Sequence, residues 1–195
     1  MQSSLRLAVT FDPVRLQADL DRILTDDFVP HFNKGYYTGD WSVVPLRSIG
    51  GQARQIYPDP TAKSTWQDTP LLDRCPYVRE VLAYFRCPQQ AVRFMRLKAG
   101  SVIREHRDLA LSFKDGEVRL HIPVRTNPEL DFRFAGRRVV MAEGECWYHD
   151  FTELHSVANR GETDRIHLVI DCVVNEWLSD LLLSESARAE AQQGG

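Results

Sequence analysis

Turn-forming residues recur at short intervals through the second half of this sequence, and this spacing constrains the fold more than any other feature. Between the turns lie short runs of β-type residues. Many short strands at regular spacing are typical of a sandwich or barrel, and not of βαβ units. We therefore predict a mainly β core over about residues 91–175. The turn signals are Ala99-Gly100, Asp115-Gly116, Thr126-Asn127-Pro128, Ala135-Gly136, Glu143-Gly144 and Arg160-Gly161.

The residues before this core predict flanking helices. Asp12 followed by Pro13 is an N-cap with proline at the first helical position, and apolar residues then recur at helical spacing. This pattern predicts a helix over residues 13–25. Pro76 begins a second apolar stripe and a second short helix.

The remaining segments predict one strand, one loop and a tail. Residues 41–46 have the composition of a strand, and residues 57–70 are rich in Pro, Thr and Asp, which favours a loop. Residues 184–195 are small and polar, so we expect a flexible C-terminal tail. The chain then divides into a single domain, residues 1–183, followed by this tail.

Charge and composition exclude several classes of protein. The chain has 195 residues, with 24 Lys and Arg against 27 Asp and Glu, so its net charge of −3 does not suit a nucleic-acid-binding protein. No run approaches the roughly 18 apolar residues of a membrane span. The N-terminus lacks the pattern of a secretory signal, and the four cysteines form no C-x-x-C pair. We expect a cytoplasmic protein with free thiols that contacts neither nucleic acid nor membrane.

Two predicted strands have one apolar and one polar face. Residues 118–124 place Arg119 and His121 opposite four aliphatic residues, and residues 165–171 place Arg165 and His167 opposite three. A solvent-exposed sheet face would also alternate. However, each polar face contains Arg and His in place of a mixture of Lys, Glu and Thr. We interpret this choice as the lining of a polar cavity.

Three residues form a candidate metal site. His106 and Asp108 point the same way on an extended chain, and His155 can supply a third ligand. Two imidazoles and one carboxylate make the facial triad of non-haem Fe(II) oxygenases, which leaves positions open for other ligands. A lone H-x-D pair is more often a solvated polar pair. The same residues also match the start of the kinase motif H-R-D-L-x-x-x-N, but Phe113 stands where that motif has Asn.

Arg165 is a candidate anion-binding residue. It lies ten residues after His155, and a planar guanidinium binds a carboxylate through two hydrogen bonds. The alternative is a salt bridge at a sheet edge with Asp164 or Asp171. With the candidate metal site nearby, we favour a pocket for a dicarboxylate.

The ordered combination of these segments resembles the aspartyl/asparaginyl β-hydroxylase family, whose relatives include bacterial hydroxylases of free amino acids such as proline. The similarity covers about residues 75–175. The segments that carry it are His106-Arg107-Asp108, Arg119-Leu120-His121-Ile122-Pro123, Gly144-Glu145-Cys146-Trp147-Tyr148, His155-Ser156-Val157-Ala158-Asn159 and Asp164-Arg165-Ile166-His167-Leu168.

The resemblance implies a double-stranded β-helix (jelly-roll, cupin-like) core and a dioxygenase that uses Fe(II), 2-oxoglutarate and O₂. It implies that His106, Asp108 and His155 are the iron ligands. It further implies that Arg165 binds the distal carboxylate of 2-oxoglutarate, and that Arg119 and His121 contact this co-substrate. A serine that some members place before the H-x-D segment is absent, because Phe94-Met95-Arg96 occupies that region.

The expected reaction is hydroxylation of an unactivated C–H bond in a small substrate, with a free amino acid favoured over peptidyl Asp or Asn. One alternative is a jelly-roll protein that binds a metal or small ligand without turnover. Another is isomerase or hydrolase chemistry with Zn or Mn. A substrate carboxylate would suit one or more of several arginines, although most are expected on the surface: Arg93, Arg96, Arg104, Arg107, Arg125 and Arg133. The sequence gives no indication of oligomeric state.

Overall fold

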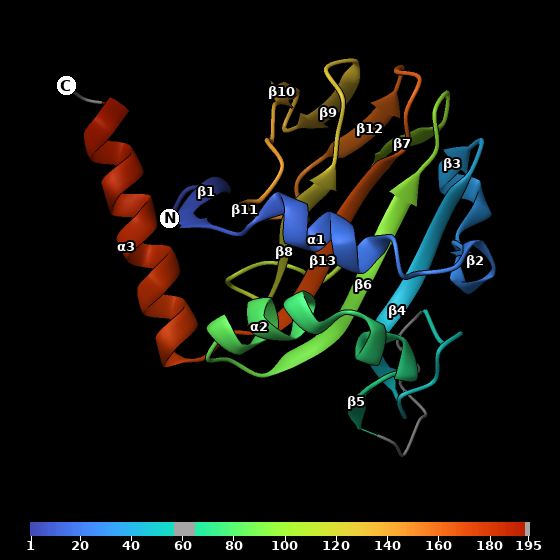
Figure 1. The fold of residues 1–195 in the computed structure, drawn as a ribbon. Helices are drawn as coiled ribbons and strands as arrows, with labels where there is room; N and C mark the ends of the chain where they lie inside the picture. The colour runs from blue at the N-terminus through green and yellow to red at the C-terminus, as the bar shows by residue number, and fades with distance from the viewer. Residues whose placement is uncertain (57–64, 194–195) are drawn as a thin grey trace.

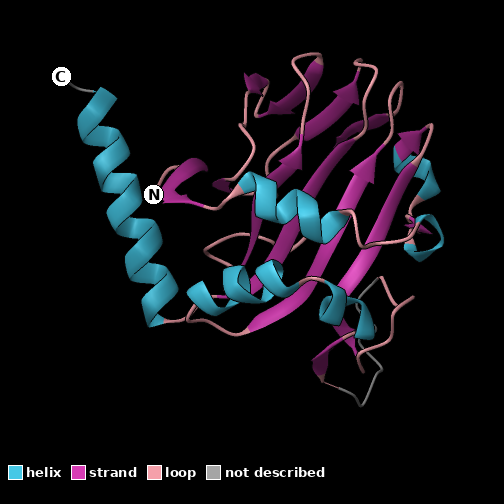
Figure 2. Ribbon diagram, viewed as in Figure 1, coloured by secondary structure: helices cyan, strands magenta, loops and turns pink. Residues whose placement is uncertain are grey.

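The strands of the computed structural model, which describes residues 1–56 and 65–193, form two antiparallel sheets (Figure 1, Figure 2). The larger sheet has eight strands, in the order β1 (Ser4–Thr10), β11 (Glu145–His149), β8 (Glu117–Arg125), β13 (Arg165–Val173), β6 (Gln89–Leu97), β4 (Trp41–Ile49) and β2 (Val29–Pro30), with β5 (Trp66–Asp68) paired to β4. The smaller sheet has five, in the order β10 (Arg137–Val139), β9 (Leu130–Phe134), β12 (His155–Asn159), β7 (Val102–His106) and β3 (Tyr37–Thr38).

From β6 to β13 the chain passes back and forth between the sheets. β6, β8, β11 and β13 belong to the larger sheet, whereas β7, β9, β10 and β12 belong to the smaller one. This winding is that of a double-stranded β-helix. The prediction of a mainly β jelly-roll core with flanking helices is therefore confirmed.

Each face of the larger sheet contributes to a different part of the interior. On β8 and β13 the aliphatic residues pack with the helices in one apolar cluster, which includes Leu120 and Leu168. The opposite faces, with His121 and His167, point toward the smaller sheet and are almost fully buried. The alternating pattern therefore produces a polar layer between the sheets, and not a solvated face.

Helices α1 (Pro13–Leu20) and α2 (Pro76–Tyr84) cover the outer face of the larger sheet, and Figure 1 shows both in front of it. The expected N-cap is present, because Asp12 Oδ1 accepts hydrogen bonds from the backbone N–H groups of Val14 (2.9 Å) and Arg15 (3.2 Å). The second helix begins at Pro76 as predicted.

The first helix is shorter than predicted. It ends at Leu20 and not at Thr25, and a 3₁₀ turn, η1 (Thr25–Asp27), follows. The reason is the buried carboxylate of Asp19. Its Oδ2 accepts a hydrogen bond from the backbone N–H of Val78 (2.8 Å) at the start of α2, so the chain turns where the two helices meet.

Two of the predicted segments around the sheet edge also need correction. The strand predicted over residues 41–46 is β4, which continues to Ile49. Residues 57–64 of the predicted loop lie outside the described residues, but the rest is ordered into β5 and a 3₁₀ helix, η3 (Pro70–Arg74). Another 3₁₀ helix, η2 (Lys34–Tyr36), precedes β3.

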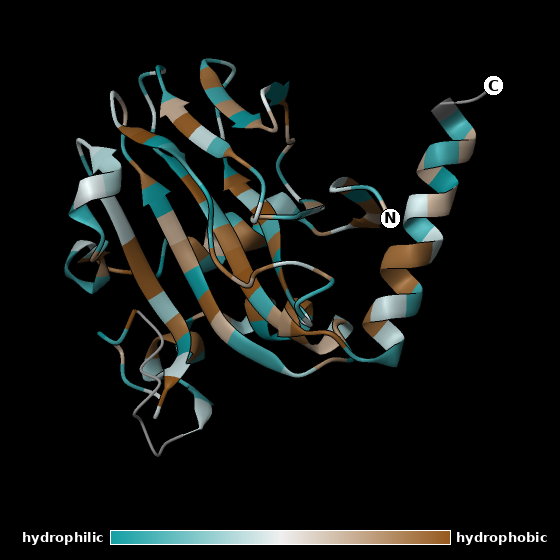
Figure 3. Cartoon of the chain, turned by 180° about the vertical axis from the view of Figure 1, so that it is seen from behind, coloured by the Kyte–Doolittle hydropathy of each residue, from teal (hydrophilic) through white to brown (hydrophobic). Residues whose placement is uncertain are grey.

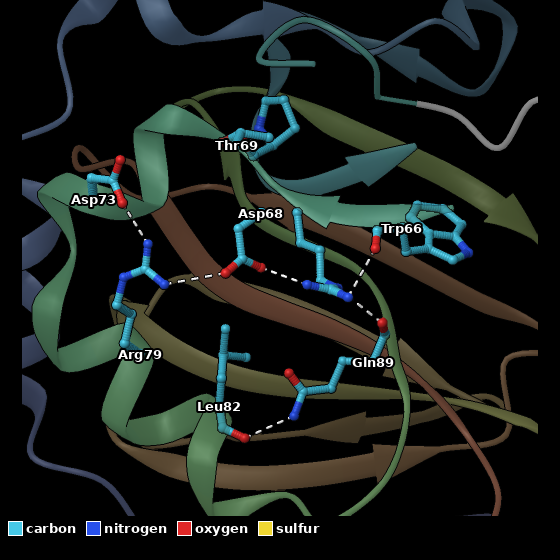
Figure 4. A network of polar contacts seen from close by, with 9 residues as sticks. Trp66, Asp68, Thr69, Asp73, Arg79, Leu82 and Gln89 are labelled. Carbon is cyan, nitrogen blue, oxygen red and sulfur yellow. Dashed lines mark hydrogen bonds and ion pairs between the residues drawn. The ribbon is translucent and has the colours of Figure 1, made fainter. Parts of the chain in front are cut away.

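A network of polar contacts holds this edge together (Figure 4). Arg79 of α2 pairs with Asp68 of β5 (3.1 Å) and with Asp73 of η3 (2.5 Å). Asp68 in turn pairs with Arg47 of β4 (2.6 Å), whose guanidinium also donates to the backbone oxygens of Trp66 and Gln89. These contacts give fixed positions to a segment whose composition alone indicates a loop.

The predicted flexible tail is wrong for residues 184–193, because they form the second half of α3 (Glu176–Gln193). Alanine, glutamate, arginine and glutamine are good helix formers, so this half needs no apolar stripe. It is also tethered, since the buried Ser186 Oγ accepts a hydrogen bond from the backbone N–H of Gln2 (2.8 Å). Figure 3 shows that the most hydrophobic residues of α3 lie in its first half. None of the described helices is long and apolar enough to cross a bilayer.

Candidate active site

The three predicted metal ligands meet at one end of the smaller sheet. His106 is the last residue of β7, Asp108 follows it, and His155 is the first residue of β12. His106 and His155 are direct partners in the antiparallel ladder, and their ring centroids lie 4.2 Å apart. One ligand atom from each of the three side chains lies within 4.8 Å of the others.

Hydrogen bonds to the backbone fix which nitrogen each histidine presents. His106 Nδ1 lies 2.7 Å from the carbonyl oxygen of Arg104, and His155 Nδ1 lies 3.0 Å from that of Glu153. A carbonyl oxygen only accepts, so each Nδ1 carries the proton and each Nε2 is left with a lone pair. This is the usual outer-shell arrangement of metal-binding histidines. Together with the Asp108 carboxylate, the donor set fits a non-haem Fe(II) site.

Arg119 binds two carboxylates on neighbouring strands. Its Nη1 lies 2.7 Å from Asp108 Oδ2, while its Nε and Nη2 lie 2.7 and 3.0 Å from the two oxygens of Asp171. Arg93 Nη2 also binds Asp171 Oδ2, at 2.5 Å. Burial alone would lower the pKa of Arg119, but the two carboxylates raise it. The cluster is balanced in charge, so it holds Asp108 in place without a buried excess charge.

Arg165 differs from these arginines because it has no carboxylate partner among the residues that the structure describes. Only 2% of its surface is exposed, and it hydrogen-bonds to His167 Nδ1 (2.9 Å). The alternative prediction, a salt bridge of Arg165 with Asp164 or Asp171, is wrong. Asp164 accepts a hydrogen bond from the backbone N–H of Ala99, and Asp171 binds Arg93 and Arg119. Burial lowers the pKa of Arg165 to about 9. A buried cation without a counter-ion fits an anionic ligand, such as one carboxylate of a dicarboxylate.

His121 and His167 extend a buried row of nitrogen atoms from Arg165. Their Nδ1 atoms lie 3.2 Å apart. Among the described residues, no partner is found for His121 Nε2, His167 Nε2 or Arg165 Nε. Burial, followed by the positive charges nearby, lowers the pKa of both histidines well below the usual range, so both are neutral. Phe151 lies between this row and the metal site, with ring centroids 5.0 Å from His121 and 4.8 Å from His155.

Rings at the start of β4 and in the segment before it form a wall beside the metal ligands. The Tyr36 ring centroid lies 4.8 Å from that of His106. His31 stacks on Trp41 at 3.5 Å, and the indole Nε1 of Trp41 is buried, without a partner among the residues described. Trp66 of β5 is not part of this wall, because it lies at the far end of β4, paired with Ile49.

The match to a known family covers this whole arrangement. The sequence model of the family described as aspartyl/asparaginyl beta-hydroxylase matches residues 13–174, a range that contains the strands from β2 to β13 and every site residue named above. The chain belongs to the aspartyl/asparaginyl β-hydroxylase family.

One relative of known function and two solved structures are similar to this chain. An L-proline cis-4-hydroxylase of Rhizobium meliloti (strain 1021) is 30% identical over 166 residues, which are 84% of this chain and 58% of the relative, so the chain spans little more than half of that protein. A 2OG-Fe(II) oxygenase family oxidoreductase of Burkholderia pseudomallei has a similar fold, with a TM-score of 0.59 and 19% identity over 89% of this chain and 86% of that chain. The fold is also similar to that of a Pseudomonas putida prolyl-4-hydroxylase, with a TM-score of 0.56 and 12% identity over 90% of this chain and 94% of that chain.

Sequence reasoning missed several residues of this hydroxylase-family site. It placed His167 on a polar strand face without a role, and it did not separate Arg93 from the surface arginines. Arg93 is buried, whereas Arg104, Arg107 and Arg133 are exposed. The position of Arg93 opposite Val169, on the inner face of the sheet, depends on pairing between β6 and β13. No short-range sequence pattern contains that information.

Proposed function

We propose that this protein is an Fe(II)- and 2-oxoglutarate-dependent dioxygenase that hydroxylates an unactivated C–H bond of a small amino acid. Its two sheets and flanking helices act as a single domain. The free amino acid is favoured over a peptidyl residue because the relative named above with 30% identity is an L-proline cis-4-hydroxylase. When bound, Fe(II) and 2-oxoglutarate supply the redox chemistry: one oxygen atom of O₂ enters the substrate as hydroxyl, and the co-substrate is oxidised to succinate and CO₂.

His106, Asp108 and His155 would hold the metal ion through two imidazole Nε2 atoms and one carboxylate. The backbone carbonyls behind both histidines orient these rings before the metal arrives. Arg119 orients the carboxylate of Asp108 and partly neutralises it. Three protein ligands leave the remaining positions of an octahedral ion for co-substrate and O₂.

The observation that carries this proposal is the buried, unpaired cation of Arg165. A site for metal alone needs no such group, whereas a five-carbon dicarboxylate held at the metal by one end requires a cation for the other end. Its guanidinium binds a carboxylate with directed hydrogen bonds and excludes a neutral ligand of the same shape. His121, which lies one aromatic ring from the metal site, supports the same co-substrate pocket through its contact with His167, with 3.2 Å between the two Nδ1 atoms.

The amino-acid substrate is supported by Arg93 and the aromatic wall. Arg93 Nε has no partner among the described residues, and Val169 beside it faces the space between the sheets. A substrate carboxylate at this guanidinium would lie next to Asp171, whose own charge is shared with Arg119. The stacked rings of Trp41 and His31 lie near Arg93 and Asp108 and offer flat surfaces, which suits a small ring or short side chain.

A turnover screen tests the proposal. The protein is incubated with Fe(II), 2-oxoglutarate, O₂ and single free amino acids, and succinate and a product heavier by one oxygen atom are measured by mass spectrometry. We expect both with at least one free amino acid, in equal amounts, and neither with Asp108→Ala. Succinate with Asp- or Asn-containing peptides alone would contradict the substrate class. Tight binding of 2-oxoglutarate without turnover of any substrate would favour a non-catalytic binding protein.

A further inference from the structure

The row of buried nitrogens at Arg165 contains a second hydrogen-bond donor whose proton position follows from its neighbours. A guanidinium can only donate, so in the contact between Arg165 Nη2 and His167 Nδ1 (2.9 Å) the imidazole nitrogen is the acceptor. His167 is neutral, hence its proton lies on Nε2. His121 Nδ1, 3.2 Å from the same nitrogen, then carries its own proton, because two facing lone pairs would repel, and the two donors share the single lone pair of His167 Nδ1.

These assignments leave two N–H groups buried and without an acceptor. His167 has no exposed surface, and Arg165 is 2% exposed. In residues 1–56 and 65–193 neither His167 Nε2 nor Arg165 Nε has a partner. Buried donors without acceptors are rare in folded proteins because each costs about 1–3 kcal/mol. Two such donors on residues that also hydrogen-bond each other indicate that an anion completes the site.

We propose that His167 is a co-substrate-binding residue, which donates its Nε2–H to the same carboxylate that Arg165 binds. The inference rests on the proposed function and adds to it. His167 has two roles in this site: its Nδ1 orients the Arg165 guanidinium, and its Nε2–H adds a directed donor. His121 acts through His167, because its Nδ1–H holds the neighbouring ring in the tautomer that donates from Nε2.

The site selects for a ligand with a carboxylate at the end remote from the metal. A 2-oxo acid without this second carboxylate would leave both donors unpaired, and burial would make this loss large. Selectivity between 2-oxoglutarate and 2-oxopentanoate, which has the same chain length and lacks the distal carboxylate, therefore reports directly on the pair Arg165 and His167.

Calorimetric titration tests the inference without turnover. The Mn(II)-loaded full chain, in which no oxidation of co-substrate is needed for a signal, is titrated with 2-oxoglutarate and with 2-oxopentanoate. We expect His167→Leu to weaken 2-oxoglutarate binding about tenfold or more, the usual effect of losing a hydrogen bond to a charged group. Binding of 2-oxopentanoate should change less than about twofold.

Two further variants separate the roles and control for burial. His167→Gln can place an amide N–H near the original Nε2, so it should recover part of the lost affinity. His149→Leu removes another fully buried imidazole whose two nitrogens lack partners in the described part of the chain. Its ring packs against Phe132, Phe134 and Trp147, with the His121 ring 6.4 Å away, and it makes no hydrogen bond to Arg165 or His167. We expect its 2-oxoglutarate affinity to stay within about twofold of wild type.

The possible outcomes are distinct. The role of His167 would be overturned if His167→Leu weakened the binding of 2-oxoglutarate and of 2-oxopentanoate equally, or weakened neither. It would also be overturned if His149→Leu lost as much affinity for 2-oxoglutarate as His167→Leu. Failure of the wild-type protein to bind 2-oxoglutarate would overturn the proposed function itself, and this inference with it. Circular dichroism and Mn(II) affinity of each variant show that folding and the metal site are intact, and His167→Gln keeps the test decisive if His167→Leu does not fold.

Discussion

Arg119 and Asp108 are joined by a 2.7 Å hydrogen bond, and through it the candidate metal site is linked to a buried charge cluster on the larger sheet. The same guanidinium binds both oxygens of Asp171, which also binds Arg93. Asp171 on β13 therefore holds Arg119 in place, and Arg119 orients the candidate metal ligand Asp108, which follows β7. The two sheets of the jelly roll are connected at the point where the chemistry is proposed to occur.

This cluster makes Asp171 a strong determinant of stability. Asp171→Asn leaves two buried guanidinium groups with too little negative charge, and removing one partner of a buried ion pair costs about 3–5 kcal/mol. We expect the free energy of unfolding, measured by urea denaturation at pH 7.5, to fall by about 3 kcal/mol. The matched control is Asp73→Asn, whose side chain is 72% exposed in its pair with Arg79 and should cost less than about 1 kcal/mol.

Asp171 also predicts how the stability of the protein depends on pH in the acid range. Burial alone would raise the pKa of Asp171, but the charges of Arg119 and Arg93 outweigh it and lower the pKa below the ordinary value. The stabilisation by the ionised group is therefore present above about pH 4 and is lost as the pH falls through the folded-state pKa. The wild-type advantage over Asp171→Asn should shrink below about pH 4. A constant difference down to pH 2 would contradict this assignment.

His149 predicts a second pH effect, at milder acidity. Burial in the aromatic layer lowers its pKa to about 3, whereas the unfolded chain protonates near pH 6.5. Between these values the unfolded state binds more protons, so stability rises with pH by up to about 1.4 kcal/mol per pH unit. We expect His149→Leu to flatten this slope between about pH 5 and 6.5. Denaturation curves at several pH values measure it, and an unchanged slope would refute the prediction.

Substitution of Arg165 should change the KM for 2-oxoglutarate and leave metal binding unchanged. Arg165→Ala should raise the KM for 2-oxoglutarate by at least about tenfold, because it removes a charge-assisted pair of hydrogen bonds. Affinity for the metal should be unaffected, because Arg165 contacts none of the three ligands. Arg133→Ala, which removes an exposed arginine paired with Asp131, is the control and should keep the wild-type KM. Wild-type KM in Arg165→Ala would exclude it as a co-substrate residue.

The sequence predicted those parts of the fold that depend on local periodicity. The polar faces of the strands at Arg119 and Arg165 follow from alternation alone, and the apolar stripe of α2 follows from spacing of three and four residues. Strand β1 was missed because Ser4–Thr10 stands before the first helix, apart from the turn-rich half of the chain, and pairs with β11, about 140 positions later in the chain. The end of α1 was misplaced because it depends on the contact of Asp19 with α2.

The sequence predicts the three candidate metal ligands, but it does not predict the hydrogen bonds that orient them. The spacing of His106 and Asp108 is visible in the sequence, whereas the proton positions of the two histidines depend on backbone carbonyls that only the fold brings into place. The pairing of Arg93 with Asp171 joins residues 78 positions apart on neighbouring strands. Similarly, the contact between His121 and His167 joins strands that are neighbours only in the sheet.

The most direct test of the account is anaerobic titration of the metal-free protein with Fe(II) and 2-oxoglutarate, followed by visible absorption. The account predicts the charge-transfer band of the Fe(II)–2-oxoglutarate chelate at one equivalent of each. It also predicts that Asp108→Ala, which loses a ligand, gives no band. A properly folded wild-type protein that gives no band would contradict the proposed dioxygenase site and leave the jelly roll as a binding module.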